Sequence, residues 1–200
     1  FKGAKSLPAI VHCAAKLRVA LKDQLLLFTF RTKAEGGKVA LAHEEYLHFI
    51  RTVLATDCAD LIDIEFFTAG AELPALIEEA HTAGAAVVCS SHDFHKTPPR
   101  AELVSRMVAM QQAGADQPKL AVMPQSRADV LELLAATAEM ADLHPETPII
   151  TMSMGALGAV SRLSGEALGS AMTFANPGQA SAPGQVSLEV VNEVLDALHL

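Results

Sequence analysis

Short apolar runs recur along the chain at intervals that fit the strands of a buried sheet. Each run is rich in Leu, Val, Ile and Phe, is too short for an independent helix, and is bounded by polar or turn-forming residues. Unbroken apolar runs are typical of strands that are covered on both faces. The pattern predicts six strands, at Leu25 to Arg31, Leu61 to Phe67, Ala86 to His92, Lys119 to Pro124, Ile149 to Met154, and Ala171 to Phe174.

Between these runs the apolar positions follow the period of helices. Thr97 followed by Pro98 is typical of an N-cap and first helical position, and Gly84 is a typical helix end. The alternation predicts a parallel sheet covered by helices, either an open sheet or a closed barrel. The three helical stripes are Leu73, Leu76, Ile77 and Ala80, then Leu103, Met107 and Met110, and finally Leu188, Val191, Leu195 and Leu198.

Chain length and motifs favour the barrel. A complete eight-unit barrel takes roughly 250 residues, and the chain has 200. An open doubly wound sheet usually carries a glycine-rich phosphate turn, and no G-x-G-x-x-G follows any predicted strand. We therefore expect an α/β fold, a (β/α)8 TIM barrel forming one domain over residues 1–200. Because Phe1 opens without a preceding strand, we expect the first two β/α units to be missing.

Charge, apolar runs and cysteine content limit which binding partners and compartments fit the sequence. The formal net charge is -8, and Lys and Arg are scattered, which argues against nucleic acid binding. The chain has neither an apolar run of about 18 residues nor a charged and then apolar leader, so we expect a soluble, cytoplasmic protein without membrane contact. Cys13, Cys58 and Cys89 are odd in number and widely spaced, which predicts buried reduced thiols.

Polar side chains stand where several predicted strands end, which is where barrel enzymes carry their chemistry. Arg31, Glu65, His92 and Met154 occupy such positions. A lone histidine is more often structural than catalytic. The strand-end position of His92 modestly favours a catalytic role. His95, beyond the strand, is expected in a loop or at the surface.

Lys119 opens its predicted strand, so a solvated strand-start residue and a buried amine fit the sequence equally well. If Lys119 points into the barrel with Ala121 and Met123, apolar surroundings disfavour its charged form and lower its pKa. A neutral amine is a nucleophile toward ketones.

Three further segments contain candidate site residues. Glu35 precedes Gly36 and Gly37, which allow a tight loop that folds the carboxylate over the barrel mouth, although a solvated loop acid fits equally. Arg162 follows a run of small residues and has the side chain that binds a carboxylate by two parallel hydrogen bonds. The segment from Ser181 to Gln185 is either a lid or a connection.

Taken in order, the motifs resemble the type I 3-dehydroquinate dehydratases, over residues 1–199. The segments that carry the resemblance are Phe28-Thr29-Phe30-Arg31 with Glu35-Gly36-Gly37, Asp63-Ile64-Glu65, Ser91-His92-Asp93-Phe94-His95-Lys96-Thr97-Pro98, Lys119-Leu120-Ala121-Val122-Met123-Pro124, Ser161-Arg162, and Ala180-Ser181-Ala182-Pro183-Gly184-Gln185.

The resemblance implies a lyase of the shikimate pathway that dehydrates 3-dehydroquinate to 3-dehydroshikimate without metal or organic cofactor. It implies that Lys119 forms an imine with the substrate, His92 is the general acid and base, and Glu35 orients that imidazole. By the same resemblance, the family's second-strand glutamate and arginine have no counterpart here, and the protein is a homodimer. The implied substrate contacts are Arg31, Arg162, Ser181 and Gln185.

Two alternatives stay open on the sequence. One is another imine-forming barrel of the aldolase class, which shares fold and nucleophile but which the His92 and loop motifs fit poorly. The other is a truncated barrel without catalysis that serves as a binding module. The sequence leaves open whether the role is biosynthetic or the breakdown of quinate.

Overall fold

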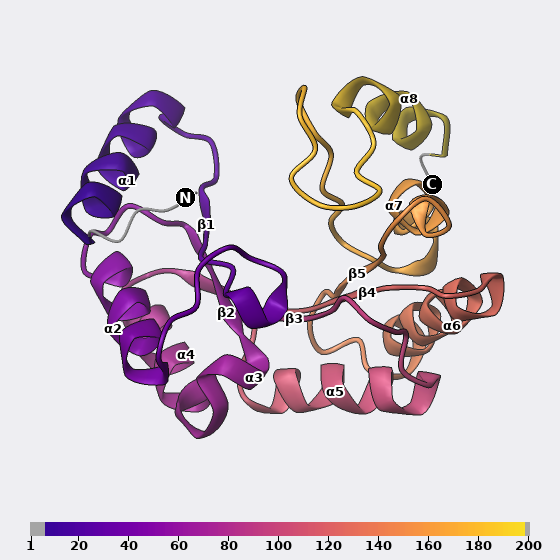
Figure 1. Cartoon of the computed structure of the whole chain (residues 1–200), viewed down its shortest axis with the longest axis horizontal. Coiled ribbons are helices and arrows are strands. Elements are labelled where there is room, and N and C mark those ends of the chain that lie inside the picture. The colour runs from indigo at the N-terminus through magenta and orange to yellow at the C-terminus, as the bar shows by residue number, and fades with distance from the viewer. Residues whose placement is uncertain (1–6, 199–200) are drawn as a thin grey trace. The chain divides into compact units, whose positions relative to one another are not determined.

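The computed structural model describes residues 7–198, which form two compact units. The first unit contains residues up to Ser91 together with Gln112–Asp116, and the second contains His92–Gln111 and the chain from Gln117 onward. Figure 1 labels the helices and strands of both units. Phe1, on which the expectation of missing units rests, lies outside the described residues, and a single domain over residues 1–200 stays a prediction.

The first unit is built on three parallel strands flanked by helices (Figure 1). Strand β2 pairs with β1 on one side, with Leu27 opposite Leu61, and with β3 on the other, with Glu65 opposite Ser90. The elements are α1 (Leu7–Leu21), β1 (Leu27–Thr29), η1 (Lys33–Glu35), α2 (His43–Leu54), β2 (Leu61–Glu65), α3 (Phe66–Ala69), η2 (Gly70–Glu72), α4 (Leu73–Thr82) and β3 (Ala86–Asp93).

The second unit has two parallel strands, with Lys119 opposite Ile150 and Ala121 opposite Met152. Its elements are α5 (Arg100–Gln112), β4 (Gln117–Val122), α6 (Arg127–Leu143), β5 (Ile150–Ser153), α7 (Ala159–Leu163), η3 (Glu166–Leu168) and α8 (Leu188–Leu198). The parallel pairing expected from the apolar runs is therefore present in both units.

The residues of strand β2 alternate between an apolar and a charged face. Ile62 and Ile64 are fully buried on one face, and Asp63 and Glu65, equally buried, alternate with them on the other. Apolar side chains of the first unit gather around the rings of α2 and β1, where the Phe30 and Phe49 centroids are 4.6 Å apart. The charged face of β2 is therefore separate from the apolar one.

The predicted strand at Ala171 to Phe174 is wrong. Only a bridge between Ile149 and Ser170 forms, extended by one hydrogen bond from the Ala171 amide to the Ile149 carbonyl. The predicted helix start at Thr97 and Pro98 is also wrong, because α5 begins at Arg100 and the Pro99 carbonyl accepts the first helical bond. Three strands are shorter than predicted: β1 ends before Arg31, β2 before Phe66 and β5 before Met154.

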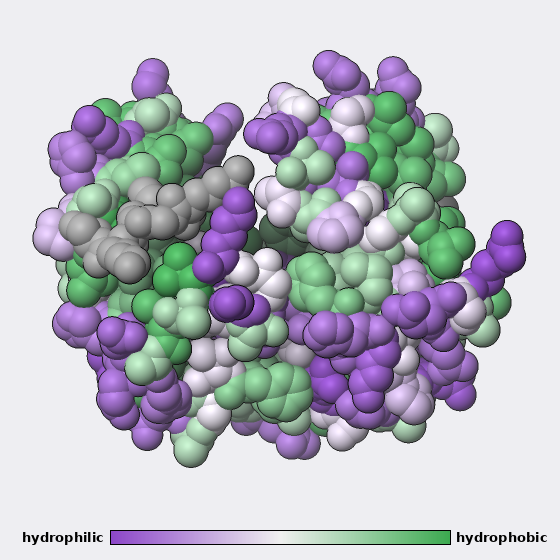
Figure 2. Space-filling view, in the orientation of Figure 1, coloured by the Kyte–Doolittle hydropathy of each residue, from purple (hydrophilic) through white to green (hydrophobic). Residues whose placement is uncertain are grey.

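The three helical stripes are confirmed as helices α4, α5 and α8, and Gly84, with φ of 79°, follows the end of α4 as predicted. The stripe on α8 is less covered than its pattern suggests, because only Val191 is buried and Leu188 is 47% exposed. Figure 2 displays apolar residues at the surface of this helix. The thiols are free, as expected, but only Cys89 is buried.

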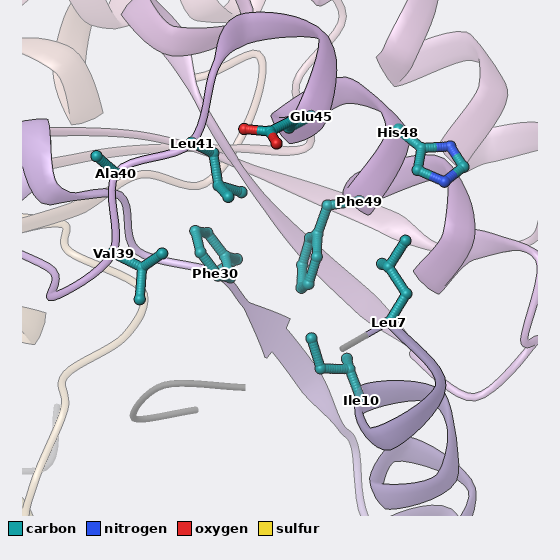
Figure 3. A pocket seen from close by; sticks show the side chains of 9 residues that line it. All are labelled: Leu7, Ile10, Phe30, Val39, Ala40, Leu41, Glu45, His48 and Phe49. Carbon is teal, nitrogen blue, oxygen red and sulfur yellow. The ribbon is translucent and has the colours of Figure 1, made fainter. Parts of the chain in front are cut away.

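A cavity of about 500 Å³ lies in the first unit between α1, α2 and the chain after β1 (Figure 3). Its lining is mainly apolar, and Ile10, Phe30 and Phe49 point toward the same space. None of the predicted site residues lines it. Among the described residues, no helix has both the length and the apolar composition that crossing a bilayer requires.

The buried face of β5 against α6 gives a test of the second unit. Thr137 Oγ1 lies 2.7 Å from Thr151 Oγ1, and both residues are buried. We expect Thr137→Val to lower the free energy of unfolding by about 1 to 2 kcal/mol, because Thr151 loses a buried partner at unchanged side-chain volume. Urea denaturation measures the change.

The matched control is Thr52→Val on α2. The Thr52 hydroxyl donates to the carbonyl four residues earlier, as the Thr137 hydroxyl also does, but the Thr52 bond is exposed and the Thr137 bond is buried. We expect a change below about 0.5 kcal/mol there. Equal effects of the two substitutions would contradict the contact between α6 and β5.

Candidate active site

Arg31 gathers three acidic side chains in the first unit. Its Nη2 lies 2.7 Å from Asp63 Oδ2, and its Nη1 lies 2.9 Å from Glu65 Oε1 and 3.3 Å from Glu35 Oε2. Nη1 also donates to the Ser90 hydroxyl at 3.0 Å. The sequence implied separate roles for Arg31 and Glu35, and the structure brings their side chains into contact.

The acids set the charge state of this arginine. Burial acts to lower the pKa of Arg31, but Asp63, Glu65 and Glu35 outweigh it, so the pKa is raised above its ordinary value. The Arg31 side chain remains 19% exposed, while those of Asp63 and Glu65 are fully buried. The guanidinium is therefore a permanent cation on a side chain that remains partly exposed.

Glu35 is buried, at 5% exposure, which overturns the solvated-loop interpretation. It ends the short helix η1, and Gly36 follows it with φ of 88°, a conformation that favours glycine. A Cβ on Gly37 would lie 1.9 Å from the Arg31 carbonyl oxygen, so this turn has no room for a side chain. The two glycines thus fold the carboxylate back onto Arg31.

Lys119 is the third residue of β4, not the first as predicted, and it is 6% exposed. A solvated strand-start lysine is therefore excluded. Because neighbours in a parallel register share a face, Lys119 lies on the same face as Ala121 and its partner Met152. Its Nζ lies 4.5 Å from the ring centroid of Phe174. The Lys119 amine is therefore buried and lies against the face of an aromatic ring.

Arg162 lies on α7 and is 2% exposed. Its Nη1 contacts the Met152 sulfur at 3.5 Å, and its Nη2 donates to the Pro183 carbonyl at 3.2 Å. Burial lowers its pKa from the ordinary value. In the described part of the chain its Nε has no hydrogen-bond partner. Since buried donors are nearly always satisfied, this guanidinium suits an anionic ligand.

Small residues hold Arg162 close to β5. A Cβ on Gly158 would lie 2.2 Å from the Ser153 carbonyl oxygen, so α7 begins in direct backbone contact with the strand end. The Ser161 hydroxyl accepts from the Ser153 amide at 2.8 Å. The small residues that the sequence offered only as a connection therefore fix the base of the Arg162 side chain.

The segment from Ser181 to Gln185 folds on itself. Gln185 Oε1 accepts from the Ser181 amide at 2.6 Å and from its hydroxyl at 3.2 Å. Gly155 donates its amide to the Pro183 carbonyl at 3.3 Å, and a Cβ on Gly184 would lie 2.4 Å from the Gly155 oxygen. The segment therefore rests on the chain after β5, and through Pro183 it also reaches Arg162.

His92 is the penultimate residue of β3 and is half-buried. Asp93, the last residue, accepts the amides of His95 and Lys96 at 2.8 and 3.0 Å and so ends the strand in a turn. His95 is exposed, as predicted. The orientation of His92 by Glu35 stays a prediction. Among the described residues, no group of three or more His, Cys, Asp or Glu side chains is arranged to hold a metal ion.

Sequence reasoning did not assign site roles to four of the residues found here. The signal for Asp63 was present, because it and Glu65 lie two apart in an apolar run and so share one buried face. Ser90, Met152 and Phe174 gave no signal, because their importance comes from partners distant in the sequence.

Parallel strands with buried cations and acids at or near their carboxyl ends define an enzyme of the α/β class. The family model for type I 3-dehydroquinase matches residues 1–200. The chain therefore belongs to the type I 3-dehydroquinate dehydratase family.

Relatives agree over nearly the whole chain. A 3-dehydroquinate dehydratase of Klebsiella pneumoniae is 48% identical over 99% of this chain and 79% of its own length. One of Salmonella typhimurium is 46% identical over 100% and 79%. The crystal structure of the type I enzyme from Clostridium difficile superposes with a TM-score of 0.93 at 43% identity, covering 98% of this chain and 77% of that one. The expected fold class, of the TIM-barrel type, is confirmed.

The acidic cluster around Arg31 predicts a large stability effect. We expect Arg31→Met to lower the free energy of unfolding by about 3 kcal/mol at neutral pH, because it leaves buried carboxylates without their cation. Urea denaturation at neutral pH measures the effect.

Arg51→Met is the control, because Arg51 pairs with Glu79 at the surface, where both side chains are 41% exposed. We expect less than about 1 kcal/mol there. A loss for Arg31→Met that is equally small would contradict the tight coupling of the cluster.

Proposed function

We propose that this chain dehydrates 3-dehydroquinate to 3-dehydroshikimate through an imine formed on Lys119. The observation that carries the proposal is the burial of Lys119 within strand β4, on the face it shares with Met152, whose sulfur contacts Arg162. A buried amine and a buried guanidinium on one face suit a substrate that has both a ketone and a carboxylate. Membership of the family supports the same reaction.

The reaction begins when the Lys119 amine attacks the ring ketone. Loss of water gives a protonated imine, whose positive charge draws electrons from the neighbouring carbon–hydrogen bond. The ring of Phe174, 4.5 Å from Nζ, favours a cation at this nitrogen. The imine therefore makes an otherwise weakly acidic carbon easier to deprotonate.

His92 performs the proton transfers. It takes the proton from the carbon next to the imine, and the electron pair forms an enamine. The enamine then expels the ring hydroxyl, to which the imidazole returns its proton, so that water leaves. Hydrolysis of the imine releases 3-dehydroshikimate and restores Lys119. Glu35 is proposed to hold the other nitrogen of this imidazole.

The remaining residues bind the substrate. Arg162 anchors the carboxylate, because its buried Nε lacks a partner among the described residues. Arg31, whose side chain remains 19% exposed, contacts the ring hydroxyls. Ser181 and Gln185, which now bond each other, close over the bound substrate. A cytoplasmic homodimer that works in the shikimate pathway completes the proposal.

One relative supports covalent chemistry. The structure of the Clostridium difficile enzyme is described as containing covalently modified comenic acid. An aldolase-type cleavage has no comparable support, since the relatives named above are dehydratases.

The first test removes the nucleophile and the base separately. We expect Lys119→Ala to lower turnover by on the order of 10⁴ or more and to abolish the substrate adduct trapped by borohydride. We expect His92→Ala to lower turnover by about 10² to 10⁴ while the adduct still forms. The absorbance of the conjugated enone product measures turnover, and peptide mass analysis locates the adduct.

Exposed residues of the same types provide the matched controls. Lys38→Ala and His95→Ala are expected to keep both turnover and adduct, because these side chains are exposed. An adduct on a lysine other than Lys119 would sink the assignment, and folded wild-type protein without turnover would favour a binding module.

The second test concerns the carboxylate anchor. We expect Arg162→Met to raise KM by about 30- to 100-fold, because it removes a charge-assisted contact to the substrate carboxylate. The adduct still forms at saturating substrate. Steady-state kinetics check the first expectation and borohydride trapping the second. Arg127→Met, on the exposed side of α6, is the control; an unchanged KM for Arg162→Met would remove Arg162 from the proposed site.

A further inference from the structure

Glu65 is a fully buried acid for which the proposed mechanism has no use. It ends strand β2, and four donors surround its carboxylate: Arg31 Nη1 at 2.9 Å, the Thr32 amide at 2.8 Å, the Thr32 hydroxyl at 2.7 Å and the Thr68 hydroxyl at 2.6 Å. Its own amide donates to the Tyr46 hydroxyl at 2.8 Å. Each carboxylate oxygen accepts two of these bonds.

Such a set of contacts fixes the carboxylate in space. A buried acid is costly unless it is paired and hydrogen-bonded, and an apolar side chain of similar volume would avoid that cost. Thr32 and Thr68 lie on opposite sides of Glu65 in the sequence, one after β1 and the other on α3. The carboxylate is therefore held independently of Arg31.

Two local features confirm that these contacts are specific. Thr32 is the N-cap of η1 but makes no side-chain capping bond, because its hydroxyl is turned toward Glu65. Tyr46 comes from α2 and fixes the backbone of Glu65. Burial raises the pKa of Tyr46 well above its ordinary value, so its hydroxyl stays neutral.

Glu65 and Asp63 divide the guanidinium between them. Glu65 holds Nη1, whereas Asp63 holds Nη2 at 2.7 Å and is itself fixed by the Ser90 hydroxyl at 2.6 Å. Because both Nη atoms are bound to carboxylates, the plane of the Arg31 guanidinium cannot turn without breaking one of these bonds. Arg31 therefore has one orientation, set by acids that are themselves rigid.

We propose that Glu65 is a positioning residue, whose carboxylate, held by Thr32 and Thr68, fixes the Arg31 guanidinium in the orientation that receives the substrate. The inference rests on the proposed function, because it takes the substrate contact of Arg31 from there. Glu65 itself touches no substrate and acts only through Arg31.

A double-mutant cycle tests this route. We expect Glu65→Gln to lower kcat/KM by about 10- to 100-fold, because a displaced guanidinium loses aligned contacts. Arg31→Met alone is expected to lower it at least as much. In the Arg31→Met background, Glu65→Gln is expected to change kcat/KM by less than about threefold, because its route of action is gone.

A gentler variant covers the case in which Glu65→Gln or Arg31→Met does not fold. Thr68→Val removes one donor to Glu65, and we expect a loss of about 3- to 10-fold in kcat/KM. That loss should vanish in the Arg31→Lys background, which keeps the charge but not the planar fork. Thr52→Val, whose hydroxyl contacts only its own helix, is expected to keep full activity.

The outcomes distinguish a failure of the proposed Arg31 substrate contact from a failure of the Glu65 positioning role. If Arg31→Met and Arg31→Lys leave kcat/KM unchanged, the substrate contact of Arg31 fails, and the inference fails with it. If these substitutions lower kcat/KM and the effect of Glu65→Gln or Thr68→Val adds to theirs in full, only the positioning role fails. If Glu65→Gln or Thr68→Val lowers the melting temperature and leaves kcat/KM unchanged, the positioning role is also overturned, because Glu65 then has a purely structural role.

Discussion

The charged site depends on the period-two alternation of buried parallel strands. In β2 the isoleucines occupy one face and the two acids the other, and all four are fully buried. Strand β4 follows the same rule, with Lys119 on the face opposite to Leu120 and Val122. A shift of the register by one residue would exchange these faces. The apolar face of each strand therefore also determines where the charged side chains of β2 and β4 are placed.

Charges brought into the interior in this way need compensation, and the two units provide it differently. In the first unit, three acids surround one arginine, and the hydroxyls of Ser90 and Thr32 donate to Asp63 and Glu65. In the second unit, the Arg162 guanidinium contacts a thioether and a carbonyl group, and its Nε has no hydrogen-bond partner among the described residues. The first arrangement holds its arginine from several sides, whereas the surroundings of Arg162 suit a ligand that supplies negative charge.

The sequence predicted the strands well where apolar runs were unbroken, and less well where backbone partners decide. Residues 171–174 have the composition of a strand, but the ladder to β5 stops after one bridge. Strand β4 begins earlier than predicted, at Gln117, because a polar residue and Pro118 join the ladder despite their low strand preference. Lys119 therefore lies inside the strand, which decides between its two interpretations.

The candidate site was predictable as a set of residue types but not as a set of contacts. Motif resemblance named Arg31 and Glu35 together, yet only the structure brings Glu35 Oε2 to 3.3 Å from the guanidinium. Residues such as Phe174 and Met152 act through neighbours that are distant in the sequence. No local pattern encodes such contacts, because chain topology creates them.

Burial can neutralise a lysine but not an arginine, and the proposed roles of these residues follow that difference. Arginine stays protonated in proteins, so Arg31 and Arg162 provide fixed positive charge whether their pKa is raised or lowered. Lysine is the cation whose neutral form burial can reach. Lys119 is 6% exposed, so it is the buried cation of this kind in the second unit. The proposed roles follow this difference, with the arginines as permanent cations that contact the substrate and the lysine as the nucleophile.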